Sequence, residues 1–239
     1  VLLSSPTAVW FAEHPHARYV CVTGTKGKST TASLIAHILE SCGVRTALAG
    51  NIGKSLWSFE EKSKIFDWWV IELSSYQISE LTISPQVAIL TSLFPEHQDW
   101  HGSVERYYAD KLRLFENLRP DSWAVIDPGA SPRLKLNPTR TCLINDACGI
   151  HYDQDWFFDA KQPLFPCSTL RLNGEHNLKN ACAAISVTKI LGIPALACKK
   201  GVASFRGLPH RLEKVGEALG LILSLIHISE PTRLLSISY

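Results

Sequence analysis

The chain has 239 residues, 46% of them hydrophobic, which is enough to bury the core of at least one large domain. Its 24 basic and 22 acidic side chains give a formal net charge of +2 and are spread along the chain. They form no basic block or stripe that could follow a nucleic-acid backbone. Composition and charge therefore indicate a globular protein and argue against nucleic-acid binding.

Cysteine usage and hydropathy bear on location. The seven cysteines lack C-x-x-C spacing, which favours reduced thiols and a cytoplasmic setting. No run of about 18 apolar residues and no signal-peptide pattern occurs, so no membrane segment is expected. The sequence starts at Val1 and contains no Met, so we interpret it as a fragment. No oligomer interface is indicated, and a monomer is expected.

Short apolar runs alternate with stretches of helical periodicity, which predicts an α/β fold with a mostly parallel sheet flanked by helices. Gly43 is expected to end the first helix, and Ser103 to cap the second. Residues 128–166 have weaker periodicity and predict a small antiparallel excursion. The predicted strands are residues 19–23, 45–49, 68–73, 87–93 and 123–126, and the predicted helices are 29–42, 103–117, 177–191 and 195–205.

The first predicted strand runs directly into the glycine loop Gly24-Thr25-Lys26-Gly27-Lys28-Ser29, and a helix follows. Glycines let backbone N–H groups curl around an anion, while the positive end of the helix faces the same charge. Lys28 would reach the β- and γ-phosphates of a nucleoside triphosphate, and the hydroxyl of Ser29 or Thr30 would bind Mg²⁺. The flanking strand and helix favour a phosphate loop over a plain glycine-rich turn.

Polar side chains follow the next buried strands. Glu72 and Ser74 end the run WWVIELSSYQ, and Glu96 and His97 follow a later strand in LTSLFPEHQDWHG. The carboxyl ends of parallel strands meet at the edge where open α/β folds bind ligands. Glu72 would therefore hold Mg²⁺ beside the phosphates, or else cap a helix. His97 is a candidate ligand or orienter of a second Mg²⁺; alone it would be read as an ordinary hydrogen-bonded histidine.

Seven motifs occur in the order found in the Mur ligases, and the chain resembles this family from about Ser4 to about Gly220. GNIG, ELSSYQ and GLPHR together resemble its MurD-type branch, which adds glutamate to UDP-N-acetylmuramoyl-L-alanine (UDP-MurNAc-L-Ala) in peptidoglycan precursor synthesis. The resemblance implies the phosphate-loop-containing central domain of that family. The motifs are TGTKGKST (23–30), GNIG (50–53), ELSSYQ (72–77), PEHQD (95–99), YADK (108–111), GEHNLKN (174–180) and GLPHR (207–211).

Such ligases use ATP to phosphorylate the acceptor carboxylate, and the amine of glutamate then attacks the acyl phosphate. The resemblance implies Lys28, Glu72, His97 and Lys111 as catalytic residues, with Ser29, Glu72, His97 and Lys111 as ligands of two Mg²⁺ ions. Lys111 matches the family's carbamylated lysine, whereas the residue pattern alone indicates a solvated lysine on a helix face. Burial would lower its pKa in the direction that carbamylation needs.

The resemblance also implies contacts with both substrates. D-glutamate is the expected amino acid. Lys26, where the family usually has Asn, and Glu96, where it often has Asp, are closer to relatives that add L-glutamate, which is therefore the alternative. The expected ATP contacts are Gly24, Thr25, Lys26, Gly27, Lys28, Ser29 and Thr30 in the loop, Asn177 and Asn180 at the adenine, and Arg211 at the phosphates, with Asn51 and Ser74 at the acceptor carboxylate.

The family pattern assigns residues 1–17 to a linker from an N-terminal uridine-binding domain and residues 18–220 to the ATP-binding domain. The uridine-binding and the C-terminal glutamate-binding domains are expected to be missing, so the chain alone is expected to be inactive. Residues 221–239 resemble translated sequencing-adapter DNA and are predicted to be a non-native tail. A folylpolyglutamate synthase-like ligase and a non-catalytic nucleotide-binding module are lower-ranked alternatives.

Overall fold

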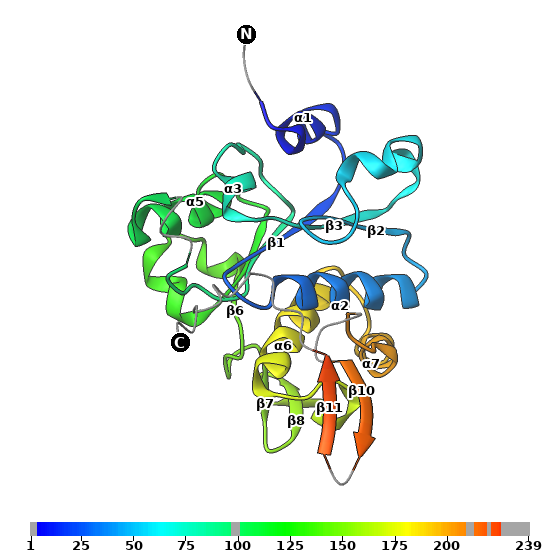
Figure 1. Ribbon diagram of the computed structural model, residues 1–239. Helices are drawn as coiled ribbons and strands as arrows, with labels where there is room; N and C mark the ends of the chain where they lie inside the picture. The colour runs from blue at the N-terminus through cyan, green and yellow to red at the C-terminus, as the bar shows by residue number, and fades with distance from the viewer. Residues whose placement is uncertain (1–3, 97–100, 209–212, 219–220, 226–239) are drawn as a thin grey trace, which may run out of the picture. The chain divides into compact units, whose positions relative to one another are not determined.

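The computed structural model of the chain describes residues 4–96, 101–208, 213–218 and 221–225 (Figure 1). The chain divides into two compact units, residues 1–206 and 207–239, which are described separately. The domain end expected at residue 220 therefore falls inside the second unit.

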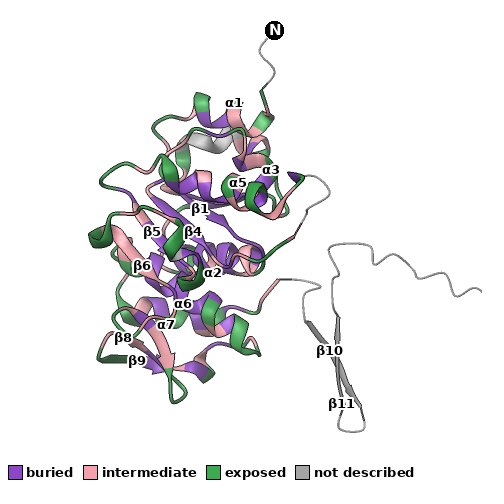
Figure 2. Ribbon diagram, turned by 90° about the vertical axis from the view of Figure 1, so that its left-hand side faces the viewer, coloured by how far each residue is buried: buried purple, intermediate pink, exposed green. Residues whose placement is uncertain are grey.

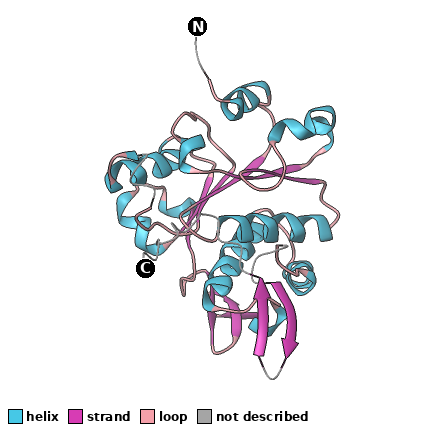
Figure 3. Cartoon of the chain, in the orientation of Figure 1, coloured by secondary structure: helices cyan, strands magenta, loops and turns pink. Residues whose placement is uncertain are grey.

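The first unit is built on a six-stranded sheet, and all its strand pairs are parallel (Figures 1 and 3). The strand order is β2-β3-β1-β4-β5-β6, so the chain moves first to one side of β1 and then to the other. Ligands bind at such a change of direction, beyond the carboxyl ends of the strands. The strands are β1 (Tyr19–Thr23), β2 (Thr46–Gly50), β3 (Trp68–Glu72), β4 (Val87–Leu90), β5 (Trp123–Ile126) and β6 (Thr141–Leu143).

Helices cover both faces of this sheet, and Figure 2 shows burial concentrated on its strands. Val20 and Val22 of β1 belong to the core on the side of the second helix, and Tyr19 and Cys21 to the opposite core, as the alternation of a strand requires. The predicted fold class is confirmed. On the first face lie α2 (Lys28–Ser41), α6 (Glu175–Ile190) and α7 (Ala195–Ser204), and on the second α1 (Pro6–Glu13), α3 (Ser75–Ile78), α5 (Val104–Glu116) and the 3₁₀ helix η1 (Leu56–Ile65).

Two predicted helix signals are confirmed. Gly43 has φ +77° and its N–H donates to the carbonyl of Glu40 (2.9 Å), which ends α2 as a C-terminal glycine does. The Ser103 Oγ accepts from the N–H of Arg106 (3.1 Å) and so caps α5.

The segment expected to be a linker contains α1, whose Trp10 and Phe11 are buried in the core. The Ser5 side chain accepts from the N–H of Ala8 (3.3 Å), and Pro6 occupies the first helical turn. Serine followed by proline is a helix-start signal, so the start of this helix could have been predicted from the sequence.

The predicted antiparallel excursion is confirmed in its second half. Strands β7 (Ile150–Asp153), β8 (Trp156–Asp159) and β9 (Gln162–Pro166) form an antiparallel sheet, and its Phe157 and Phe165 join the core beneath α2 and α6. In the first half, β6 instead extends the parallel sheet. Three short 3₁₀ helices complete the region: η2 (Pro128–Arg133), η3 (Pro138–Arg140) and η4 (Cys167–Thr169).

The second unit contains an antiparallel pair, β10 (Glu213–Ala218) and β11 (Leu221–Leu225). The predicted start of the tail, residue 221, is thus the first residue of a paired strand. Residues 226–239 lie outside the described residues, and the non-native origin of 221–239 stays a prediction. Within the part of the chain that is described, the helices are too short or too polar to cross a membrane.

Candidate nucleotide-binding site

The glycine loop connects the carboxyl end of β1 to the first turn of α2. Gly24 and Gly27 have φ +143° and +86°, and a Cβ on Gly27 would lie 2.3 Å from Oδ1 of Asn180. Helix α2 begins at Lys28, and the first turn of a helix leaves backbone N–H groups without intrahelical acceptors. The loop therefore has the backbone geometry that an anion-binding turn requires.

Side chains and backbone after β4 hold the loop in place. The N–H of Thr25 donates to the carbonyl of Ser92 (2.9 Å), and the N–H of Lys26 to its Oγ (2.9 Å). Thr91 Oγ1 donates to the carbonyl of Lys26 (2.6 Å), and Lys28 Nζ to that of Thr25 (3.0 Å). The loop is thus fixed before any ligand arrives, which lowers the ordering entropy lost on binding.

Lys111 lies directly beneath this loop. It is 2% exposed, and its Nζ donates to the carbonyl of Gly24 (3.0 Å) and lies 4.8 Å from the ring centre of Tyr107. Burial, and next the positive charge of Lys28, lower its pKa to about 7, against a smaller opposite effect of Glu96 and Glu72. The solvated lysine that the residue pattern alone indicates is therefore wrong: the helix face that carries Lys111 points into the protein.

Glu72 ends β3 and is 1% exposed. The Asn51 N–H donates to its carbonyl (2.9 Å), and the Asn51 side-chain amide to its Oε1 (3.5 Å). Gly50 has φ +101°, and a Cβ there would lie 2.2 Å from the same carbonyl, so the GNIG turn packs backbone against backbone. Glu72 thus lies at the carboxyl end of its strand, as predicted, with Asn51 beside it, and the functional roles of both stay predictions.

A magnesium ion fits these donors in part. Oxygen ligands suit Mg²⁺, and the Glu72 carboxylate and the buried Ser29 hydroxyl are oxygen donors at this edge. Among the described residues no three Asp, Glu, His or Cys side chains form a metal-binding group. An ion here would therefore take further ligands from phosphates, water or a modified Lys111.

Helix α6 reaches the loop from the other side. Asn177 and Asn180 are buried one turn apart, and the amide of Asn180 donates to Oδ1 of Asn177 (3.3 Å). The amide of Asn177 donates to the carbonyl of Asn173 (2.7 Å). The close approach of Asn180 to Gly27 therefore places this predicted pair beside the loop.

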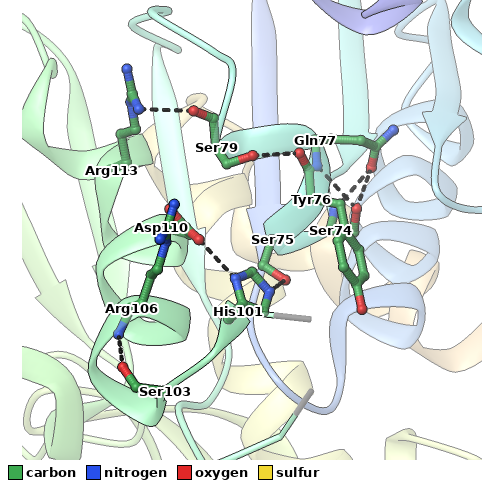
Figure 4. A network of polar contacts seen from close by, with 10 residues as sticks. All are labelled: Ser74, Ser75, Tyr76, Gln77, Ser79, His101, Ser103, Arg106, Asp110 and Arg113. Carbon is green, nitrogen blue, oxygen red and sulfur yellow. Dashed lines mark hydrogen bonds and ion pairs between the residues drawn. The ribbon is translucent and has the colours of Figure 1, made fainter. Parts of the chain in front are cut away.

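Ser74 has a structural partner that was not predicted, although Ser74 and Gln77 have the S-x-x-Q spacing of a capping box. Its Oγ accepts from the N–H of Gln77 (3.3 Å), while the Gln77 side chain accepts from the N–H of Ser74 (2.9 Å), a capping box at the start of α3 (Figure 4). Its predicted substrate role stays a prediction. His97 and Arg211 lie outside the described residues.

Three hydrogen bonds near Lys111 were not predicted. His101 is hydrogen-bonded to both Ser75 and Asp110, and Thr25 Oγ1 lies 3.1 Å from the hydroxyl of the fully buried Tyr107. The partners are 26, 9 and 82 residues apart in the sequence, so no local pattern pairs them.

A parallel α/β sheet, a glycine loop before a helix, and a buried glutamate and lysine at the same edge define a nucleotide-binding α/β domain. Residues 22–139 match the family model described as the Mur ligase middle domain. The chain belongs to the Mur ligase family.

Two curated ligases are similar in sequence to this chain. The chain is 42% identical over 226 residues to UDP-N-acetylmuramoyl-L-alanine--L-glutamate ligase of Xanthomonas euvesicatoria pv. vesicatoria (strain 85-10), which covers 90% of this chain and 48% of the relative. The ligase of the same name from Salinispora tropica is 42% identical over 232 residues, covering 92% and 50%. The chain thus spans about half the length of these relatives.

Solved structures support the fold. MurF from Acinetobacter baumannii superposes with a TM-score of 0.71 at 19% identity, covering 89% of this chain and 51% of that one. The apo form of L. casei FPGS gives a TM-score of 0.68 at 17% identity, covering 91% and 71%. At such identities the likeness concerns the fold alone.

Proposed function

We propose that the protein is an ATP-dependent ligase that joins glutamate to UDP-MurNAc-L-Ala in peptidoglycan precursor synthesis. The observation that carries this proposal is Lys111, which lies buried against the phosphate loop with a pKa lowered to about 7. A loop that only bound nucleotide would gain nothing from a second, partly neutral lysine beneath it. The names of relatives up to 42% identical support the two substrates.

In the proposed reaction the loop N–H groups and Lys28 bind the β- and γ-phosphates and hold the γ-phosphorus in line with the acceptor carboxylate. A carboxylate oxygen attacks this phosphorus and ADP leaves. The glutamate amine then attacks the acyl carbon, loses a proton, and releases phosphate. Ser29 and Glu72 would hold Mg²⁺, which would supply positive charge to the transferred phosphoryl group.

The lowered pKa of Lys111 supports a modified side chain. The unprotonated amine would add CO₂ and lose a proton, which replaces a cation by a carbamate with two oxygen donors. The carbamate would complete the oxygen ligands that Glu72 and Ser29 supply only in part. His97 is proposed as a ligand of a second Mg²⁺ on the resemblance alone.

The remaining assignments follow the same resemblance. Asn177 and Asn180 are proposed to contact the adenine, Arg211 the phosphates, and Asn51 and Ser74 the acceptor carboxylate. The relatives are named L-glutamate ligases, which favours L-glutamate over the D isomer expected from the family resemblance. A monomer in the cytoplasm is proposed, where the seven free thiols would stay reduced.

The test is a ligation assay with UDP-MurNAc-L-Ala, Mg·ATP and radiolabelled D- or L-glutamate, on a protein in which the uridine- and glutamate-binding domains expected from the family are restored to this chain. One ADP is expected for each amide formed, and Lys28→Ala should abolish both products. Lys111→Ala should keep ATP binding, lose ligation and regain it with a short-chain carboxylic acid. Mg·ATP binding without amide formation from either isomer would overturn the ligase and leave a nucleotide-binding module.

A further inference from the structure

The imidazole of His101 is enclosed on every side. Its side chain is fully buried, with Nδ1 2.7 Å from Oδ2 of Asp110 and Nε2 3.0 Å from Oγ of Ser75 (Figure 4). Its ring is stacked with that of Tyr76 (centroids 5.4 Å apart, 24° between planes) and meets the ring of Tyr107 at 69° and 5.2 Å. Both nitrogens are thus engaged, and aromatic neighbours restrain the ring.

The partners of this imidazole lie beside the two residues on which the proposed chemistry depends. Ser75 is the first residue of α3 and follows Glu72 by three positions, while Asp110 precedes Lys111 on α5. The two helices pack against each other. One side chain therefore connects the segment that carries Glu72 to the helix that carries Lys111.

We propose that His101 is a positioning residue, which acts through Ser75 and Asp110 to hold Glu72 and Lys111 at a fixed separation beneath the phosphate loop. The inference rests on the proposed function, because that separation matters only if both side chains serve the same metal–nucleotide complex. The carboxylate of Asp110 can only accept a hydrogen bond, so Nδ1 of His101 must carry the proton. This requirement fixes the orientation of the ring. Groups that hydrogen-bond to metal ligands orient them in other proteins, and His101 would act one step farther out, through Ser75 and Asp110.

A purely packing role is a poorer explanation of the same contacts. Arg113 Nη1 already donates to the carbonyl of Ser79 (2.8 Å), the residue that follows α3, so the α3 segment and α5 have a second hydrogen bond about one turn farther along (Figure 4). Removing the polar groups of Ser75, His101 and Asp110 from water costs free energy, and apolar side chains could pack the helices without that cost. The polar chain adds a defined geometry, because each ring nitrogen of His101 forms a directional hydrogen bond to a different partner.

Arg113 also offers the matched control. His101→Gln and Arg113→Gln each remove a contact between α3 and α5, but only the first touches Ser75 and Asp110. The first readout is acetylation of Lys111 by acetic anhydride at one pH, followed by mass spectrometry. His101→Gln should speed this acetylation about tenfold, the factor that corresponds to losing one hydrogen bond to a charged group. Arg113→Gln should leave it within about twofold.

The second readout is Mn²⁺ binding to the 239-residue chain with ATP, followed by electron paramagnetic resonance. His101→Gln should raise the Mn²⁺ concentration at half-saturation at least about tenfold, as expected when an oriented metal ligand loses its support. Asp110→Asn, which keeps an acceptor for Nδ1, should retain more of the affinity than Asp110→Ala. If His101→Gln does not fold, Ser75→Ala removes only one of the two hydrogen bonds and replaces it in both measurements.

The outcomes separate this inference from the proposed function. Equal acetylation of Lys111 in the His101 and Arg113 variants would overturn the positioning role, and an unchanged Mn²⁺ affinity would overturn its extension to Glu72. A wild-type chain that binds no Mn²⁺ with ATP would count against the proposed function, while the acetylation comparison would still decide the role of His101.

Discussion

Burial changes the acid–base chemistry of Lys111 and therefore the pH dependence of stability. Its pKa is about 7 in the folded chain, against an ordinary value of 10.5. Between these values the unfolded chain binds one proton more than the folded chain, so the free energy of unfolding rises with pH. The slope from this one group is at most about 1.4 kcal/mol per pH unit.

The measurement is urea unfolding of the wild type and Lys111→Met between pH 7.5 and 9.5. Buffers free of CO₂ keep the amine unmodified, and other titrating groups cancel in the difference. The free energy of unfolding of the wild type should rise relative to that of the variant by about 1.4 kcal/mol per pH unit across this range. A pH-independent difference would show that Lys111 titrates normally.

Gly27 in the glycine loop and Gly43 at the end of α2 allow backbone strain to be separated from steric contact. Gly27 and Gly43 have φ +86° and +77°, but a Cβ would lie 2.3 Å from Asn180 at the first and meet nothing within 4 Å at the second. Gly43→Ala should therefore lower the free energy of unfolding by about 1–2 kcal/mol, the strain of a left-handed residue with a side chain.

Gly27→Ala should lower stability further than Gly43→Ala and should also weaken ATP binding, because Asn180 must move away from the loop. Chemical denaturation and calorimetric titration with Mg·ATP measure the two effects. Equal stability losses in both variants would mean that the loop and α6 separate at no cost, and that the Asn180 contact does not hold them together.

The candidate site was predictable where its parts are local in sequence. Gly24 to Thr30 follow a strand and open a helix, so the turn could be predicted from its own residues. The burial of Lys111 and the Ser75–His101–Asp110 chain depend on how α5 packs against α3. Nothing in the residues adjoining Asp110 indicates that partner, so the site's interior required the structure.

At the level of elements, the N-cap of α5 stabilises the helix that carries Lys111. Ser103→Ala leaves the Arg106 N–H without its acceptor and should lower stability by about 1 kcal/mol. Ser103→Asp keeps an acceptor and adds a negative charge at the positive end of the helix, so it should keep most of the stability. Thermal unfolding of the three proteins checks the order, and an Ala variant as stable as the wild type would contradict it.

The strands were easier to predict than the smaller elements. β1, β3 and β4 are almost continuously apolar because helices cover both faces of the sheet, and that pattern is visible in sequence. β6 has only three residues, all partly buried, which is too short for any period to show. In α1 the buried Trp10 and Phe11 are adjacent and not three or four apart, so helical periodicity is hidden.

At the scale of the whole molecule, the two hydrophobic cores identified among the described residues belong to the first compact unit. Their buried members run from Trp10 to Phe205, and the unit ends at Arg206. Apolar burial is the main favourable term in folding, so residues 1–206 should contain nearly all the stabilising interactions of that unit.

Ending the chain after Arg206 should therefore change the free energy of unfolding by less than about 1 kcal/mol and leave the denaturant m-value of the transition unchanged. Tryptophan fluorescence reports the transition, because Trp10 and Trp69 are at most 1% exposed. A matched truncation after Ile190 removes α7 and with it the buried Cys198, Val202 and Phe205, and should be far less stable. A large loss in the first truncation would mean that residues 207–239 stabilise the first unit.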